Sequence, residues 1–271
     1  MLDGLTQAEK FVDKDKLSYY ENYYFCNEEP VPIRTKDNGY TLYISPIKVK
    51  DFNKYIDSLE VLRIDKNRIG DVKIIQMSYL QFLMDYVLAD ERYQLMLYNL
   101  LSLSLGDNYG YKISKKDNKC YLCVTLDDEV VTKISSKEFN QISEIIQFYN
   151  DKSYDDRVVS DDLKKAMDDY YSIKFRNQHY PTLEEKKAFV SSKNGMSLTE
   201  INQMSYRYFD FVYNSCVSND LYFAQKMIQA SYKYKVDKDV VHPLFEEKAS
   251  KFDFLQDAQS FENKVASQGK L

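Results

Sequence analysis

The longest strongly apolar stretch of the chain runs from residue 71 to residue 106, and it constrains the fold more than any other feature. Its apolar residues recur at the three- and four-residue spacing of an amphipathic helix. Asp90 interrupts the pattern, and Gly106 offers a C-terminal stop. We therefore predict two helices, at about residues 72–88 and 91–105, that pack on one another as the buried centre. The predicted buried faces comprise Val72, Ile75, Tyr79, Phe82, Leu83, Tyr86 and Val87, then Leu95, Leu97, Tyr98, Leu100, Leu101 and Leu105.

Charged residues in this stretch argue against a membrane-spanning helix. Asp85, Asp90, Glu91 and Arg92 interrupt it, whereas a span needs about 18 uncharged apolar residues. The chain has 271 residues and a formal net charge of −5, with acidic and basic residues mixed along it. Because nucleic-acid-binding domains are typically basic, we expect neither nucleic acid nor a membrane as the partner. Four cysteines in a chain of this length do not suggest a disulfide framework, and the N-terminus lacks a signal segment, so we expect a reducing compartment.

Three helix starts carry the pattern of a capping box, in which a Ser or Thr is followed three residues later by Glu. The pairs are Ser135 with Glu138, Thr182 with Glu185, and Ser197 with Glu200. We predict that the first helix buries Phe139, Ile142, Ile145, Ile146 and Tyr149 on one face. The second helix should end at Gly195, and the third should continue to about residue 212. Further helices are predicted at residues 49–62, at residues 161–173, and from Asn219-Asp220 through Phe223, Met227 and Ile228 to Tyr232.

Two short segments alternate between apolar and polar residues and are rich in β-branched and aromatic side chains, which is typical of strands. Residues 109–134 predict an antiparallel β-meander that packs on the helical core. Its strands are expected at Tyr111–Ile113, Tyr121–Leu126 and Val130–Ile134. Residues 31–35 and 40–45 predict a β-hairpin, with the turn at Asp37-Asn38-Gly39.

These elements predict a mostly α protein of the α+β type, with a helical core, a small antiparallel β-meander and extended terminal arms. We expect an N-terminal arm with the hairpin at residues 1–45 and a helical core at residues 46–235. Residues 236–271 are polar, with apolar residues at intervals, and we expect a C-terminal tail that docks on another surface.

Cys120 and Cys123 have the spacing of half a zinc site or of a redox pair. Zinc would need a second pair of ligands at matching spacing, and the remaining cysteines and histidines are scattered singly. A redox pair would open a helix after a strand, whereas this pair lies inside an alternating β pattern. We interpret both thiols as ordinary strand residues that pack as small apolar groups.

The other titratable residues do not form a catalytic or metal-binding pattern. His179 lies in a predicted loop, and His242 precedes a proline, so we expect packing or exposure rather than acid–base chemistry for both. Four acid pairs lack the central Gly and distal Glu of a calcium loop, and we interpret them as solvated faces and helix starts. The pairs are Asp127-Asp128, Asp155-Asp156, Asp161-Asp162 and Asp168-Asp169. We therefore predict no catalytic, cofactor-binding or metal-binding residue, and no enzymatic activity.

Residues 183–213 have the outline of a helix-turn-helix motif, with Gly195 at the turn. Its second helix would have to present side chains to bases and phosphates. The candidates are Asn202, Gln203 and Arg207, which stand among acidic and aromatic residues. A DNA-binding regulator is therefore kept as an alternative, ranked below an ordinary helical hairpin.

Several short segments, taken in order, carry a resemblance to a known family. They include a proline-containing entry, a Met-Ser-Tyr-Leu helix, a Tyr-Asp-Asp loop, a Pro-Thr-Leu-Glu cap and a Gly-Met-Ser helix. The segments are residues 30–33, 42–55, 64–67, 74–83, 138–156, 158–167, 181–190, 195–209 and 240–248. In order and spacing the chain resembles a family of uncharacterised proteins from tailed bacteriophages of low-GC Gram-positive hosts. It departs from that family at Pro243, where an aromatic residue is more usual after the histidine.

The resemblance implies a non-enzymatic role in tail or baseplate assembly, similar to that of tail assembly chaperones or baseplate-hub assembly proteins. The implied partners are other phage tail or baseplate proteins, with a second copy of the chain as a further possibility. The implied location is the virion, or the host cytoplasm during infection. A structural virion subunit in the baseplate or the head–tail connector is the first alternative function. None of the matching residues forms a chemical site, so the resemblance assigns no site residue.

Overall fold

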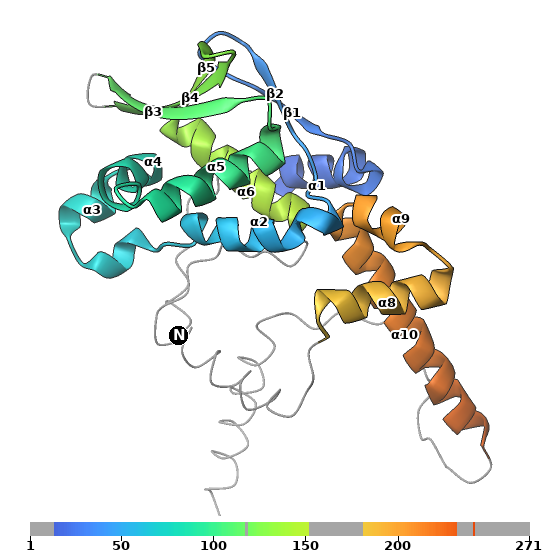
Figure 1. Cartoon of the computed structure of the whole chain (residues 1–271). Coiled ribbons are helices and arrows are strands. Elements are labelled where there is room, and N and C mark those ends of the chain that lie inside the picture. Colours follow the sequence, from blue (N-terminus) through green and yellow to red (C-terminus); the bar gives the residue numbers. More distant parts are fainter. Residues whose placement is uncertain (1–13, 117–118, 152–180, 232–240, 242–271) are drawn as a thin grey trace, which may run out of the picture. The chain divides into compact units, whose positions relative to one another are not determined.

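A computed structural model describes residues 14–116, 119–151, 181–231 and 241 of the chain (Figure 1). It is mostly helical with two small antiparallel sheets, which confirms the predicted fold class. The chain divides into two compact units, residues 1–213 and residues 214–271. The predicted helix at 161–173 and nearly all of the predicted tail at 236–271 lie outside the described residues. Each helix in the described part of the chain is too short or too polar to span a lipid bilayer.

The N-terminal part of the description begins with helix α1 (Lys14–Tyr23) and the short helix η1 (Phe25–Asn27). Strands β1 (Val31–Arg34) and β2 (Thr41–Ile44) then form the predicted hairpin, in which Val31 pairs with Ile44. Val31, Leu42 and Ile44 are fully buried in the main core. The predicted domain boundary after residue 45 stays a prediction, although the hairpin before it contributes to that core.

The predicted helix at 49–62 is confirmed, as η2 (Val49–Asp51), α2 (Phe52–Leu59) and η3 (Glu60–Leu62) in succession. A short helix, η4 (Lys66–Ile69), follows it. Tyr55 and Leu59 turn into the core. Helix α2 packs against α5, so this segment forms one wall of the main core.

The central stretch contains more breaks than predicted. Its first half forms α3 (Val72–Gln76), α4 (Tyr79–Phe82) and the π-helical turn η5 (Leu83–Val87), so the prediction of one helix at 72–88 was wrong. Ser78 caps α4 by accepting a hydrogen bond from the amide of Gln81 at 3.3 Å. The Lys66 ammonium donates to the carbonyls of Ile75 and Met77, which stabilises the break. The second half, α5 (Glu91–Leu105), is confirmed and ends at Gly106.

The buried faces of these helices also differ from the prediction. Five residues predicted to be inward, Val72, Ile75, Tyr86, Leu95 and Tyr98, are exposed. The core receives seven of the predicted residues together with Ile74 and Leu80, which were not predicted. The seven are Phe82, Leu83, Val87, Leu97, Leu100, Leu101 and Leu105. The helices also do not form the expected hairpin, because α5 packs mainly on α2 and β2, while α4 packs on α6 and β4.

The predicted β-meander is confirmed as β3 (Gly110–Lys116), β4 (Lys119–Leu126) and β5 (Glu129–Ser135), paired antiparallel in that order. Helix α6 (Ser136–Asn150) follows directly, and the five residues predicted for its inner face are all buried. Helices α4 and α6 pack on the inner face of the sheet, which carries Cys120, Leu122 and Val124 (Figure 1).

A second, smaller core is built from Val49, Val190, Ile201, Met204 and Phe209. It joins η2 to the last three described helices, which are α8 (Leu183–Asn194), α9 (Leu198–Gln203) and α10 (Tyr206–Ala230). The capping boxes at Thr182 and Ser197 are present as predicted, and Gly195 ends α8 at a φ of 67°.

Two predicted boundaries in this region were wrong. The helix that begins after Ser197 does not reach residue 212, because it breaks at Met204 and Ser205. There the backbone pairs with the segment before η2: the Val49 amide donates to the Met204 carbonyl, and the Tyr206 amide donates to the Ile47 carbonyl. The expected new helix at Asn219-Asp220 is also absent as a separate element, because α10 passes through both residues without a break.

Candidate functional site

The two thiols that suggested a metal or redox site point away from each other. Because successive side chains of a strand alternate between faces, a spacing of three places Cys120 and Cys123 on opposite sides of β4. The Cys120 thiol donates to the Met84 sulfur at 4.0 Å inside the core. The Cys123 sulfur lies 3.2 Å from the Ser114 hydroxyl. Both thiols are free and buried, and in the part of the chain that is described no group of three or more His, Cys, Asp or Glu residues is arranged to hold a metal.

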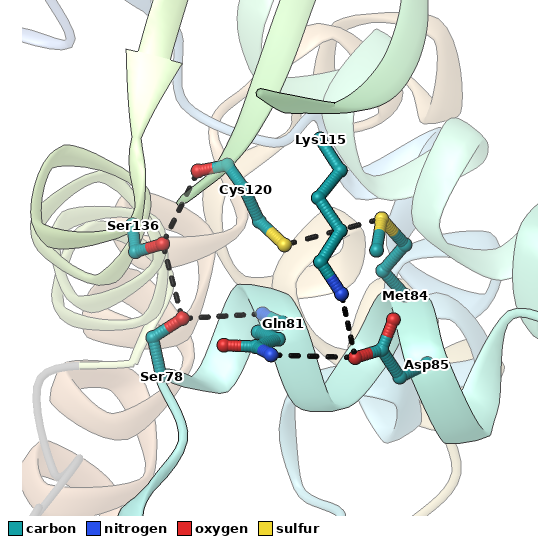
Figure 2. A network of polar contacts seen from close by, with 7 residues as sticks. All are labelled: Ser78, Gln81, Met84, Asp85, Lys115, Cys120 and Ser136. Carbon is teal, nitrogen blue, oxygen red and sulfur yellow. Dashed lines mark hydrogen bonds and ion pairs between the residues drawn. The ribbon is translucent and has the colours of Figure 1, made fainter. Parts of the chain in front are cut away.

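A polar network surrounds Cys120 where α4, β4 and α6 meet (Figure 2). The Ser136 hydroxyl donates to the Cys120 carbonyl at 3.3 Å, and the Ser78 hydroxyl donates to Ser136 at 3.1 Å. On the other side, Asp85 accepts hydrogen bonds from Gln81 at 3.4 Å and from Lys115 at 3.5 Å. The network therefore ties the π-helical turn to the sheet and to the start of α6.

The chemistry of this network favours a structural role. Burial raises the pKa of the Cys120 thiol, and the Asp85 carboxylate raises it further, while Lys115 acts in the opposite direction. Because the thiolate is the nucleophilic form, a raised pKa leaves a thiol that is unreactive at neutral pH. Asp85 and Lys115 neutralise each other at the edge of the cluster. The network can hold three elements together, and its side chains lack the activated nucleophile that covalent catalysis requires.

The three side chains predicted for DNA contacts are mostly engaged inside the protein. Arg207 donates to the Phe148 carbonyl at 2.8 Å and to the Glu21 carboxylate at 2.7 Å, and its side chain is only 13% exposed. Asn202 accepts a hydrogen bond from the Lys187 ammonium at 2.8 Å. Gln203 is exposed. The break between α9 and α10 also divides the segment that would have been the recognition helix.

The remaining titratable candidates are either turn residues or lie outside the description. Asp127 and Asp128 form the turn between β4 and β5, with φ values of 50° and 65°. This left-handed backbone is typical of two-residue hairpin turns, and Asp tolerates it better than most residues. His179, His242 and the acid pairs at 155–156, 161–162 and 168–169 lie outside the described residues.

The most distinctive surface among the described residues lies on the C-terminal half of α10. Between Asn214 and Ala230 no residue is buried. At 3.6 residues per turn, five exposed apolar side chains of this segment fall on one half of the helix, which also carries the exposed Asp220. The polar side chains Ser218, Gln225, Lys226 and Gln229 fall on the other half. We call these five residues the α10 apolar face: Leu221, Phe223, Ala224, Met227 and Ile228.

The sequence predicts a helix through Phe223, Met227 and Ile228, and α10 contains all three. In the structure Phe223 is 62% exposed and Met227 is 73% exposed. The spacing was the signal for an amphipathic helix, and only the fold shows that the apolar half remains exposed.

No family model, no curated protein and no solved structure matches this chain. A functional proposal therefore rests on the geometry of the described residues and on the resemblance of the short segments.

Proposed function

We propose that this chain is a non-enzymatic bacteriophage protein that binds other tail or baseplate proteins during assembly. The observation that carries the proposal is the α10 apolar face. Isolated apolar residues are common on protein surfaces, but a contiguous apolar patch usually marks a site of interaction. An amphipathic helix that exposes its apolar half is the form in which helix-in-groove recognition occurs.

The large side chains of the α10 apolar face could contribute substantial free energy to the binding of a partner. Full burial of a Phe or Met side chain contributes about 1.5–3 kcal/mol relative to exposure. Burial of Phe223 and Met227 together would therefore contribute about 3–6 kcal/mol to binding, or at least about a hundredfold in affinity. The spacing of four residues places these two side chains next to each other on the helix.

The geometry of residues 183–213 supports the alternative function, a DNA-binding regulator, less well than the α10 apolar face supports protein binding. Arg207 is needed inside the fold to pair with Glu21, and Asn202 is needed to pair with Lys187. The net charge of −5 also repels a phosphate backbone. Protein binding is therefore the better supported of the two functions.

The proposal is tested by affinity purification of the tagged chain from cells infected with the phage that encodes it. We expect a tail or baseplate protein of that phage to copurify with the wild-type chain. The double variant Phe223→Ser with Met227→Ser should lose it, because serine removes most of the apolar contact. The matched control, Gln225→Ala with Gln229→Ala on the polar half of α10, should retain it. Equal recovery of the partner with both variants would contradict the proposed role of the α10 apolar face.

Quantitative mass spectrometry of purified virions separates an assembly factor from a structural subunit. An assembly factor should be absent from mature particles or present at well below one copy per structural ring. Stoichiometric copies would favour the alternative of a baseplate or connector subunit.

For the copurification experiment, circular dichroism of both double variants provides the control that their helices are intact.

A further inference from the structure

The strand register places four lysines on the outer face of the β3–β4–β5 sheet. The inner face carries Cys120, Leu122 and Val124, so the alternating residues Lys119, Tyr121 and Cys123 belong to the outer face. On that face Lys119 is exposed, Tyr121 is half-buried and Cys123 is buried. Cys123 is paired with Lys112 on one side and with Lys133 on the other, and Lys119 is paired with Lys116. All four lysines are exposed. We call this set, Lys112, Lys116, Lys119 and Lys133, the lysine face.

The positive charge of the lysine face is largely uncompensated. Lys112 lies 3.8 Å from the Asp128 carboxylate, which is 98% exposed, and such a surface pair contributes little. The other three lysines form no ion pair with a described carboxylate. Lys116 and Lys119 lie directly opposite each other, an arrangement of like charges that destabilises a sheet. On the inner side of the same strand, by contrast, Lys115 is paired with Asp85.

The spacing of the lysines suits an extended acidic segment. Lys112 and Lys116 are four residues apart on one strand, or about 13 Å at 3.3 Å per residue. An extended peptide presents its side chains i and i+4 on one side at the same spacing. Lys133 lies two strands away, about 10 Å across the sheet, and can contact a second acidic residue.

The position of β3 also suits a partner in extended conformation. Among the described strands, β3 and β5 are the two edges of this sheet. The β5 edge is contacted by the β1–β2 turn, because the Asn38 side-chain amide donates to the Val131 carbonyl at 2.7 Å. The described backbone partners of β3 are all on β4. An additional strand would therefore pair at the β3 edge, beside Lys112 and Lys116.

The composition of the face favours a protein partner over nucleic acid. Proteins that bind single strands combine positive charge with several stacking aromatic side chains. Besides these lysines, the outer face of the sheet carries one half-buried aromatic residue, Tyr121, and strands β3, β4 and β5 contain no arginine. The net charge of the chain, −5, adds long-range repulsion for a polyanion as dense as nucleic acid.

We propose that the lysine face binds an acidic, extended segment of a partner protein. This inference rests on the proposed function, because the partner belongs to the same class, a tail or baseplate protein. The lysine face would be a second contact surface for such a partner, beside the α10 apolar face. The acidic segment supplies the carboxylates that Lys116, Lys119 and Lys133 lack within the described fold, and it adds one for Lys112 beside the exposed Asp128.

The test measures fluorescence anisotropy of a labelled peptide of about six Glu-Thr repeats, titrated with the full-length chain. We expect saturable binding that weakens as salt rises, and no binding of the matched Gln-Thr peptide. The variant Lys112→Glu with Lys133→Glu should weaken binding by about tenfold or more, because attraction becomes repulsion. The control Lys50→Glu with Lys54→Glu makes the same change in net charge on η2 and α2, and it should weaken binding by less than about twofold.

Three results would overturn the proposal. They are equal binding of the Glu-Thr and Gln-Thr peptides, an equal loss in the two charge-reversal variants, and tighter binding of an oligothymidylate probe than of the acidic peptide. If the reversed variant unfolds by circular dichroism, Lys112→Gln with Lys133→Gln replaces it and should still weaken binding. The variant Phe223→Ser with Met227→Ser should bind the peptide like the wild type. Failure of peptide binding is therefore distinguishable from failure of the α10 contact.

Discussion

At the scale of single residues, Arg207 has a larger structural role than its place in a candidate DNA-binding motif suggested. Its guanidinium bonds the Phe148 carbonyl and the Glu21 carboxylate, and it lies 5.1 Å from the centre of the Phe25 ring. It thereby joins α1, η1 and α6 to the start of α10. A sequence cannot reveal this role, because Glu21 and Arg207 are 186 residues apart.

We predict that Arg207→Ala lowers the free energy of unfolding by about 2–4 kcal/mol, because a mostly buried charged residue loses two hydrogen bonds and leaves Glu21 without this partner. Urea denaturation followed by circular dichroism measures the change. Arg92→Ala is the control, since the Arg92–Glu60 pair is exposed on both sides, and it should cost less than about 0.5 kcal/mol. Similar losses in the two variants would show that the Arg207 contacts contribute no more than a surface pair.

The four thiols should differ in reactivity according to their burial. Cys26 is exposed, Cys216 is partly exposed, and Cys120 and Cys123 are buried. With a chromogenic disulfide reagent at neutral pH, we expect Cys26 to react first, Cys216 more slowly, and the two strand thiols only after denaturation. The raised pKa of Cys120 slows its reaction further. Modification of Cys120 or Cys123 in the fast phase, identified by peptide mapping, would contradict their placement.

At the scale of elements, the three capping boxes were predictable because they depend on residues only three positions apart. All three form, yet their surroundings differ. Glu138 is 6% exposed and also accepts the amide of Lys36 at 2.8 Å, which holds the β1–β2 turn against the start of α6. Glu200 forms its box at the surface, where hydrogen bonds from Ser197 lower the pKa of its carboxyl group.

We therefore predict that Glu138→Ala costs about 2–4 kcal/mol, since it loses the cap and leaves the Lys36 amide without this acceptor. Glu200→Ala should cost clearly less, because its capping box is at the surface and its carboxylate has no long-range contact of this kind among the described residues to lose. Thermal and urea denaturation of the two variants give the comparison. If Glu200→Ala were the more damaging change, the long-range contact of Glu138 would have little effect on stability.

The breaks inside predicted helices separate what a sequence can show from what it cannot. Ser78 and Gln81 form a Ser-x-x-Gln pattern, so the start of α4 could have been recognised from local residues. The break at Ser205 could not, because it depends on pairing with Lys48 and on a bond of its amide to Glu28 at 2.6 Å. The inner face of α5 was also ambiguous, since apolar residues lie on nearly every side of that helix.

At the scale of the whole molecule, the many tyrosines make stability sensitive to alkaline pH. The hydrogen bond to Tyr40 raises the pKa of Tyr109 to about 12, and burial raises the pKa of Tyr206 to about 12. In an unfolded chain the pKa of tyrosine is about 10. Between these values the unfolded chain releases protons that the folded chain retains, so the free energy of unfolding should fall as pH rises.

Urea denaturation at about pH 8, 10 and 11 tests this expectation. In the variant Tyr206→Phe the free energy of unfolding should fall less as pH rises, because phenylalanine has no group that ionises. Its ring can keep the stacking on Phe52, whose ring centre lies 3.6 Å from that of Tyr206. Tyr208→Phe is the control, since this hydroxyl is on an exposed residue. Stability that is constant or increases over this range would contradict the buried, neutral state of these tyrosines.

The amphipathic pattern of α10 was readable in the sequence, but its role as a candidate site was not. Whether an apolar half-face packs inside or remains outside depends on the elements that surround it. The lysine face was hidden for a related reason, because its members are brought together only by the register of three strands. For both surfaces, the sequence supplies the individual residues, but it does not show that they share one exposed face.

We proposed that the chain belongs to a tailed bacteriophage and binds its tail or baseplate proteins, and the most direct test of this claim is site-specific photo-crosslinking during infection by that phage. A benzophenone amino acid at Phe223 should form an adduct with a tail or baseplate protein, and the same group at Gln225 should form little or none. Mass spectrometry of the adduct identifies the partner. The absence of any adduct at Phe223, equal adducts at both positions, or an adduct only with a second copy of the chain would contradict binding of another phage protein through the α10 apolar face.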